Sequence, residues 1–248
     1  MNEDRVQREK EWHNDTFGSG VREKTDKFYS ITGLMAKDLN ETINRELLKE
    51  RTVFLDYGCG SGYYLIKMAP NIKKGTGIDI SEALINHARA RIQKANIENL
   101  EFFVMDAMNT SFKDSYFDII HGKSILHHLN LEKSLKEIKR ILKDGGKAFF
   151  VEPLDTNPII KLYRKMTSEA RTMDEQPFKI KDLKLVKSIF KGAEIKYYFC
   201  FSLLAVPLRR YKIFGKVLNV LFFMDKIVLH KYSPLKWMAW SCAIVLKN

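Results

Sequence analysis

A glycine-rich turn constrains what this chain can fold into more than any other segment. The turn reads DYGCGSG from Asp56 to Gly62, between an apolar stretch at 52–56 and a helical pattern that runs to about Ala69. Glycines allow a sharp turn and let a ligand approach the backbone closely. The first N–H groups of the following helix are then free to bind that ligand. The pattern therefore predicts a ligand-binding loop at the end of a buried strand.

Strands and helices continue to alternate after this turn. One helix is predicted to begin at Ser81, which caps it, and to run to about Ala95. Two more are predicted at 131–142 and 181–190. Strands that alternate with helices pair in parallel through right-handed crossovers, so the chain is predicted to be an α/β protein. The predicted strands span 52–56, 74–80, 100–105, 117–123, 147–151, 194–201 and 237–246.

Acidic residues mark the ends of the first three predicted strands. Asp56 precedes the first glycine, Asp79 ends the second strand, and Asp106 follows the third. These strand ends meet at one edge of a parallel sheet, where Asp79 could accept ribose hydroxyls and Asp106 could reach an adenine amino group. The third glycine comes one residue earlier than in a dinucleotide fingerprint. An acid before the glycines also repels a pyrophosphate and suits a cationic ligand.

Five segments follow one another in the order of a known family: LDYGCGSG, GIDIS, MDA, FDIIHGKSILHHL and IKRILKDGGKAFFVEP. Over residues 52–152 the chain resembles the class I methyltransferases that use S-adenosylmethionine (SAM). The resemblance implies SAM as the cofactor and a Rossmann-like, seven-stranded sheet with an antiparallel last strand and helices on both faces. It implies these cofactor-binding residues: Asp56, Gly58, Gly60 and Gly62 around the methionine moiety, Asp79 at the ribose, Asp106 and Ala107 at the adenine, with Ile80 and His121 beside them.

One methyltransferase domain is expected over residues 1–248, since no internal repeat divides the chain. Residues 51–152 would form the SAM-binding core, and 1–50 a helical N-terminal lid. Two helical inserts, at 153–180 after the fifth strand and 202–236 after the sixth, would enclose the methyl acceptor. A closing strand at 237–247 would complete the sheet.

Two adjacent histidines follow the fourth predicted strand, where an acceptor would bind. A neutral imidazole is a suitable base near pH 7, so His127 or His128 is the predicted catalytic base. The alternative is that these histidines pack against or cap the next helix. The predicted acceptor-side residues come from the N-terminal segment and the first insert: Trp12, His13, Tyr29, Tyr163, Arg171, Asp174 and Glu175.

Positive charge is concentrated at the end of the chain. The formal net charge is +12, and residues 182–248 hold 12 lysines and arginines against 3 acids. An amphipathic helix is predicted at 208–230, with aliphatic and aromatic residues from Leu218 to Leu229. Such a helix suits an anionic membrane surface or a lipid-like acceptor better than RNA, whose bases need spaced stacking residues. A plain cap over the acceptor pocket is the third alternative.

The expected function is methyl transfer to an O, N or C nucleophile of a small or amphipathic acceptor, lipid-linked molecules included. The alternatives are an RNA methyltransferase, a SAM-binding module without turnover, and a nicotinamide oxidoreductase, which the glycine spacing disfavours. Three distant cysteines give no metal-ligand spacing and favour a reducing compartment. The charged first 15 residues do not resemble a signal peptide. A cytoplasmic protein is therefore expected, with peripheral attachment to the inner membrane face as an option.

Overall fold

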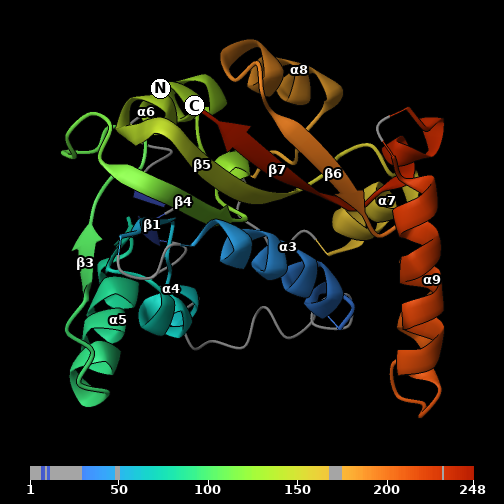
Figure 1. Cartoon of the computed structure of the whole chain (residues 1–248). Helices are drawn as coiled ribbons and strands as arrows, with labels where there is room; N and C mark the ends of the chain where they lie inside the picture. The colour runs from blue at the N-terminus through green and yellow to red at the C-terminus, as the bar shows by residue number, and fades with distance from the viewer. Residues whose placement is uncertain (1–6, 9, 12–29, 48–50, 168–174, 231) are drawn as a thin grey trace.

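A seven-stranded mixed sheet forms the centre of the computed structural model, which describes residues 7–8, 10–11, 30–47, 51–167, 175–230 and 232–248 (Figure 1). The strand order is β3-β2-β1-β4-β5-β7-β6. Strands β1 to β5 pair in parallel, and β7 runs antiparallel to both β5 and β6. The expected fold class is thereby confirmed. The strands are β1 Val53–Tyr57, β2 Lys74–Asp79, β3 Leu100–Val104, β4 Phe117–Lys123, β5 Leu142–Pro153, β6 Glu194–Tyr198 and β7 Ser241–Lys247.

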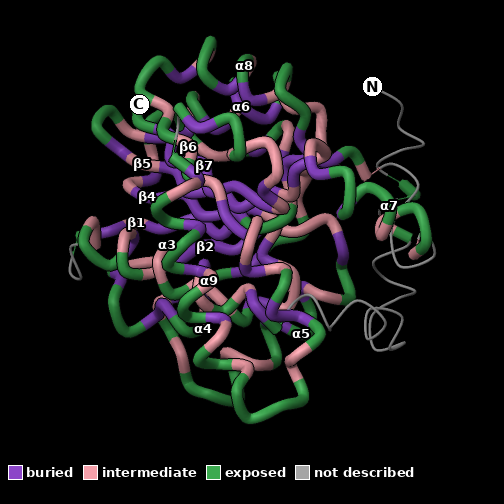
Figure 2. Tube along the Cα trace, turned by 90° about the vertical axis from the view of Figure 1, so that its right-hand side faces the viewer, coloured by how far each residue is buried: buried purple, intermediate pink, exposed green. Residues whose placement is uncertain are grey.

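Helices cover both faces of this sheet. The described α-helices are α3 Thr32–Glu46, α4 Tyr63–Met68, α5 Glu82–Lys94, α6 Leu131–Ile141, α7 Pro158–Met166, α8 Ile180–Ile189 and α9 Phe214–Val228. Neighbouring residues of a strand point to opposite faces. Phe54 accordingly belongs to the core cluster on the face that α3, α4, α5 and α9 cover, whereas Leu55 belongs to the cluster on the face of α6 and α8. Figure 2 shows the strands buried between exposed outer helices.

Side-chain caps set the starts of several helices. Ser81 Oγ accepts a hydrogen bond from the backbone N–H of Leu84, which confirms the predicted start of α5. Asn130 caps α6 in the same way, and Asn157 caps α7 ahead of Pro158. These caps satisfy N–H groups that lack a partner within the helix.

Three predicted boundaries in the second half of the chain are wrong. The last strand begins at Ser241 rather than Trp237, because Pro234–Met238 forms a 3-10 helix, η6, that Ser233 caps. The sixth strand ends at Tyr198, where Phe199 takes a positive φ of 66°. The fifth strand begins at Leu142, five residues before its predicted start. The reason is that β5 continues through the expected turn as an irregular, glycine-containing segment.

The C-terminal insert is a pair of packed helices rather than one. The 3-10 helix η5, Phe201–Leu208, precedes α9, so the predicted helix start at 208 is six residues early. Asp225 is buried within α9 and accepts hydrogen bonds from the backbone N–H groups of Cys200, Phe201 and Ser202. The Ser202 hydroxyl donates to the same carboxylate. One acid therefore caps η5 and fixes α9 against it.

A second carboxylate joins α9 to the other end of the chain. Asp38 of α3 accepts hydrogen bonds from Tyr198 of β6 at 2.6 Å and from Lys226 of α9 at 2.7 Å. Burial opposes ionisation, yet the contacts with Lys226 and Tyr198 hold the pKa of Asp38 below its usual value. Among the residues described, none of the helices is both long enough and apolar enough to cross a bilayer.

Replacing Asp225 tests this anchoring. Asp225→Ala leaves three backbone N–H groups without their acceptor, so we expect the free energy of unfolding to fall by about 2–4 kcal/mol. Urea denaturation followed by circular dichroism measures the change. Asp144→Ala, at an exposed carboxylate in β5, is the control and should change stability by less than about 0.5 kcal/mol. An equal effect of the two substitutions would contradict the proposed anchoring.

Candidate functional site

The glycine-rich loop after β1 is held by the end of β2. The carbonyl oxygen of Ile78 accepts hydrogen bonds from the N–H groups of Gly58 and Cys59, at 2.9 and 2.8 Å. The next residue, Asp79, accepts from the N–H of Gly60 at 2.8 Å through Oδ2. Three consecutive loop N–H groups are therefore bound by two consecutive residues of the neighbouring strand, which gives the loop a defined shape.

Glycine is required in this loop for two different reasons. Gly58, Gly60 and Gly62 all have positive φ angles, of 77°, 51° and 73°. At Gly62 a Cβ atom would also lie 2.7 Å from the ring of Phe102, so only glycine fits between the loop and β3. At Gly60 nothing lies within 4 Å of such an atom. Gly60 therefore faces open space, where a ligand can approach the backbone.

Asp79 lies at the centre of this arrangement. Its Oδ1 accepts from the N–H of Ser81 at 2.9 Å, while Oδ2 binds Gly60. Burial raises the pKa of Asp79, and these backbone hydrogen bonds oppose the rise. The backbone N–H of Ile80 also binds this carboxylate. A carboxylate has about four acceptor sites, so Asp79 keeps capacity for a further donor. Ile80, the next residue, is partly exposed.

Asp56 is paired with a histidine on the adjacent strand. Asp56 lies opposite His121 in the β1–β4 register, and its Oδ1 lies 2.8 Å from the histidine Nδ1. Both side chains are buried. The His121 ring stacks on Tyr64 of α4 with centroids 3.8 Å apart, and the Tyr64 hydroxyl donates to Asn40 of α3. The start of the glycine loop is thus linked to α3 through aromatic and polar contacts.

Asp106 forms a turn directly after β3. Its Oδ1 accepts from the N–H of Met108 at 2.8 Å, and the Tyr57 hydroxyl donates to the carbonyl oxygen of Ala107. The N–H of Met105 binds the carbonyl oxygen of Asp79 at 3.0 Å, which fixes this turn beside the end of β2. The structure therefore places the predicted cofactor residues of β1, β2, β3 and β4 at one carboxyl edge of the sheet.

His127 is held between two carboxylates. It lies in the 3-10 helix η3, Leu126–His128, and its Nδ1 is 2.5 Å from Oε2 of Glu152, while its Nε2 is 3.4 Å from Oε1 of Glu175. Glu175 also accepts from Arg164 of α7 at 2.9 Å. Glu152 is fully buried in β5 and further accepts from the backbone N–H groups of Ile125 and Leu126.

The two carboxylates around His127 favour a positioning role for it over that of a catalytic base. Burial alone would lower the pKa of His127, but the charges and hydrogen bonds of Glu152 and Glu175 outweigh it and raise the pKa to about 9. At pH 7 both ring nitrogens therefore carry protons and donate to carboxylates. His128 is partly exposed, and its ring lies 4.1 Å from that of His127.

The other predicted acceptor-side residues divide into two groups. Tyr163 is next to Arg164 in the sequence of α7, and Glu175 contacts both Arg164 and His127 of η3. Five residues lie outside the described part of the chain: Trp12, His13, Tyr29, Arg171 and Asp174.

Glu152 and Tyr64 are the important side chains that the sequence analysis did not select. Glu152 ends an apolar strand in the segment FFVEP, and a lone acid in such a run is the signal that marks a paired, buried carboxylate. Tyr64 follows the glycine loop and looks like an ordinary helix residue. Only the three-dimensional structure shows that its ring stacks on that of His121.

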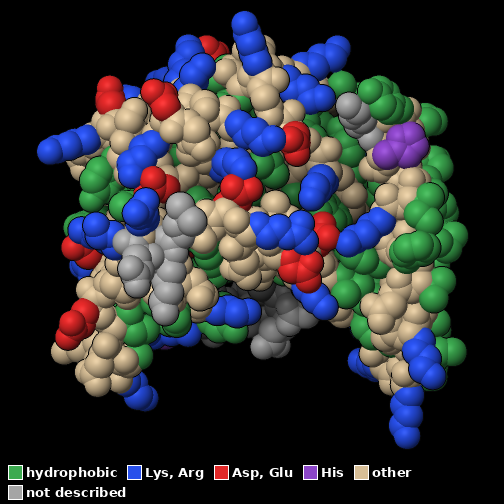
Figure 3. Space-filling model, viewed as in Figure 1, with side chains coloured by type: hydrophobic (Ala, Val, Ile, Leu, Met, Phe, Trp, Pro, Cys, Tyr) green, Lys and Arg blue, Asp and Glu red, His purple; other side chains and the backbone are tan. Residues whose placement is uncertain are grey.

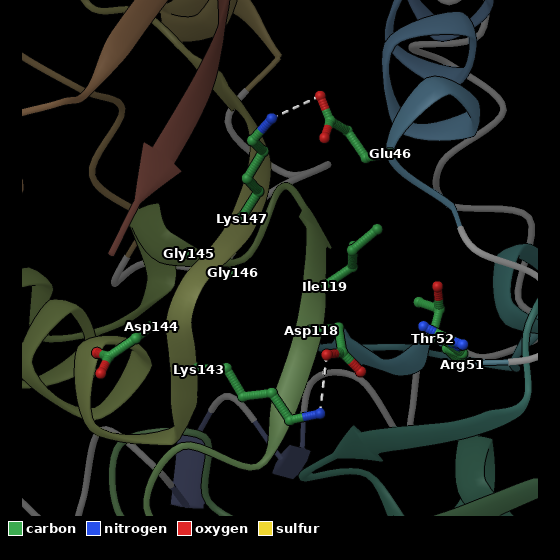
Figure 4. A pocket seen from close by; sticks show the side chains of 10 residues that line it. All are labelled: Glu46, Arg51, Thr52, Asp118, Ile119, Lys143, Asp144, Gly145, Gly146 and Lys147. Atoms are coloured by element: carbon green, nitrogen blue, oxygen red, sulfur yellow. Dashed lines mark hydrogen bonds and ion pairs between the residues drawn. The ribbon is translucent and has the colours of Figure 1, made fainter.

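A separate pocket of about 200 Å³ opens at the opposite edge of the sheet, where β1 and β4 begin (Figure 4). Its charged side chains neutralise one another: Lys147 pairs with Glu46 at 2.6 Å, and Lys143 with Asp118 at 2.8 Å. None of the predicted site residues lines it. The pocket is therefore distinct from the carboxyl-edge site.

Comparison with known proteins identifies the core. Residues 54–146 match a family described as a methyltransferase domain. The demethylmenaquinone methyltransferase of Lactococcus lactis is 28% identical over 171 residues, which are 66% of this chain and 64% of that protein. The 27-O-demethylrifamycin SV methyltransferase of Amycolatopsis mediterranei is 35% identical over 96 residues, 38% of this chain and 35% of that protein. The chain thus spans less than two thirds of the length of these relatives.

The fold agrees with this match. The crystal structure of the YcgJ protein from Bacillus subtilis superposes with a TM-score of 0.57 at 17% identity, covering 89% of this chain and 99% of that one. Residues 54–146 are thus similar in sequence to a methyltransferase domain, and the fold around them is that of the YcgJ protein.

Proposed function

We propose that this protein transfers a methyl group from SAM to an O, N or C nucleophile of a small or amphipathic acceptor. The observation that carries the proposal is the glycine loop, whose three successive N–H groups are bound by Ile78 and Asp79. At the end of β2, a ligand therefore meets the exposed backbone of the loop and the carboxylate of Asp79. SAM supplies an electrophilic methyl group on a sulfonium centre when bound.

The residues present fit SAM better than a dinucleotide. Gly60 faces open space, as close contact with a ligand requires. Asp56, Asp79 and Asp106 bring carboxylates to this edge, which disfavours a pyrophosphate and suits an ammonium group. We assign Asp79 to the ribose hydroxyls through its remaining acceptor capacity. Asp106, Ala107 and Ile80 would contact the adenine, and the glycine loop with Asp56 and His121 would surround the methionine moiety.

His127 acts as a positioning residue in this proposal. It joins the turn after β4 to β5 through Glu152, and to α7 through Glu175 and Arg164. These contacts hold the start of the first insert beside the carboxyl edge of the sheet, where an acceptor would bind. His128, next to it and partly exposed, is the remaining candidate for a base.

We infer a small-molecule acceptor from the names of the relatives and from the position of the insert at 153–180. Relatives are named for demethylmenaquinone and 27-O-demethylrifamycin SV, which are small molecules rather than nucleic acids. Glu175 is one of the insert residues predicted to shape the acceptor pocket, and its contact with His127 places it beside η3. We propose that the insert at 153–180 encloses the acceptor.

SAM binding is the first test of this proposal. Calorimetry should show micromolar affinity, about −8 kcal/mol. Asp79→Ala removes a charged acceptor and the anchor of Gly60, so it should weaken binding by about 1.5–3 kcal/mol. Asp144→Ala removes a carboxylate from the opposite edge of the sheet and should leave the affinity unchanged. Binding of NADH without binding of SAM would contradict the assignment.

Turnover is the second test, because a SAM-binding module would pass the first. The protein should release S-adenosylhomocysteine from SAM when supplied with small amphipathic phenols, quinols or amines. Structured RNA, which the net charge of +12 makes the alternative acceptor, serves as the comparison. Release with RNA alone would overturn the small-molecule proposal, and release with neither would leave a binding module.

Removing the buried imidazolium tests the role of His127. His127→Gln leaves the buried Glu152 without its cation and Glu175 with Arg164 alone, so the free energy of unfolding at pH 7 should fall by about 3 kcal/mol. The pKa of His127 is raised from 6.5 to about 9 by folding. Its contribution is therefore fully present below about pH 6.5 and is lost as the pH rises through 9. The stability difference between wild type and variant should shrink over that range.

Urea denaturation at pH 6, 7.5 and 9 measures this effect. His87→Gln, at an exposed histidine of α5, is the matched control and should change stability little at any of these values. A constant difference between wild type and His127→Gln from pH 6 to 9 would show that His127 is neutral in the folded protein.

A further inference from the structure

An exposed apolar stripe runs along α9. Val220, Phe223, Met224 and Ile227 follow one another at helical spacing, so they share one side of the helix. Their exposed fractions are 62%, 64%, 40% and 59%. Figure 3 shows hydrophobic side chains along the outer flank of this helix. Isolated exposed apolar residues are ordinary, but a continuous stripe of four large ones indicates a contact surface.

The fold does not need this stripe. The opposite side of α9 packs on the protein through Leu218 and Phe222, both buried, and is held by Asp225 and by the Lys226–Asp38 ion pair. The exposed stripe therefore contributes little to holding the helix in place, and substitutions there should leave the fold intact.

The apolar surface extends beyond α9 at both ends. Large exposed hydrophobic residues precede the helix in η5 and the turn after it, and follow it in the segment from Tyr232 into η6. With the stripe they form what we call the α9 surface: Leu204, Tyr211, Ile213, Val220, Phe223, Met224, Ile227, Tyr232 and Leu235.

The exposed charge of residues 201–248 has one sign. Residues 201–248 contain eight lysines and arginines and one acid, Asp225, which is buried and caps η5. Arg210, Lys212 and Lys216 are exposed at the start of α9. Figure 3 shows basic side chains gathered at that end of the helix. The surface that this part of the chain presents is thus apolar along the helix and cationic at its end.

The apolar stripe and the positive charge together distinguish between the possible binding partners of the α9 surface. A second copy would bring two cationic surfaces together, which costs electrostatic energy. RNA would need stackable side chains, yet three of the four stripe residues are aliphatic. A bilayer with anionic headgroups satisfies both features, because apolar side chains enter the headgroup boundary while lysine and arginine bind phosphates.

We propose that the α9 surface docks the protein on anionic lipid bilayers, with the stripe inserted at the interface and the basic residues at its N-terminal end on the headgroups. The proposal is independent of the methyl-transfer activity, since it rests on side chains away from the glycine loop. It would bring the enzyme to acceptors that partition into membranes.

Co-sedimentation with vesicles tests the proposal on the full chain. Vesicles of phosphatidylglycerol and phosphatidylcholine should bind the protein at least about tenfold more strongly than vesicles of phosphatidylcholine alone. The double variant Phe223→Ser/Ile227→Ser should lose at least about tenfold in binding, because two buried side chains are removed from the interface. Phe103→Ser/Ile180→Ser, at exposed apolar positions of β3 and α8, should bind as the wild type does.

The charge contribution is tested separately. Lys212→Gln/Lys216→Gln should weaken binding to anionic vesicles about tenfold or more and reduce its salt dependence. Lys181→Gln/Lys184→Gln removes the same charge from the exposed side of α8 and should have a much smaller effect. All variants should bind SAM as the wild type does, so a failure of vesicle binding is distinguishable from a failure of the proposed activity.

Three results would overturn the proposal. One is equal binding to neutral and anionic vesicles, or to neither. Another is retention of structured RNA in a gel shift at the same salt concentration without vesicle binding. The third is a dimer in analytical ultracentrifugation that Phe223→Ser/Ile227→Ser converts to monomer, with no binding to vesicles.

Discussion

Two consecutive residues at the end of β2 shape the candidate cofactor site. The carbonyl oxygen of Ile78 binds two loop N–H groups, and the carboxylate of Asp79 binds the third. This depends on the parallel register of β1 and β2, which places Tyr57 opposite Ile78. A shift of one residue would turn each side chain to the other face of the sheet and remove the carboxylate from the loop. The cofactor site is therefore a consequence of strand pairing.

Two histidine–carboxylate pairs reinforce the same edge. Asp56 and His121 join β1 to β4, while Glu152 and His127 join β5 to the turn after β4. Unpaired charges at such buried positions would cost several kcal/mol each, so each pair tolerates little displacement. The first pair connects through Tyr64 to α3, and the second through Glu175 to α7. The helices beside the site are thus oriented by groups that lie within the sheet.

The core was predictable from sequence because its signals are local. Strand β4 has the predicted bounds, and Ser81 caps α5 as expected, since apolar alternation and a cap depend on neighbouring residues only. The role of His127 was not predictable, because its pKa depends on Glu152 and Glu175, which are 25 and 48 residues away. An exposed imidazole would be a base, whereas the same side chain between two carboxylates is a cation. The start of the last strand was missed although its signal is local: Ser233 caps a 3-10 helix that begins at Pro234 and takes up the first residues of the predicted strand.

Asp225 shows how one buried acid can decide the orientation of a helix. In the sequence it interrupts an apolar run and resembles a solvent-exposed position. Because α9 carries apolar residues around most of its circumference, hydrophobicity alone does not determine which side packs inward. The N–H groups at the start of η5 need an acceptor, and only the side of α9 that carries Asp225 provides one. Leu218 and Phe222 lie on that side and become buried. Val220, Phe223 and Ile227 must then face outward, so the exposed apolar stripe is the direct consequence of capping η5 from within α9.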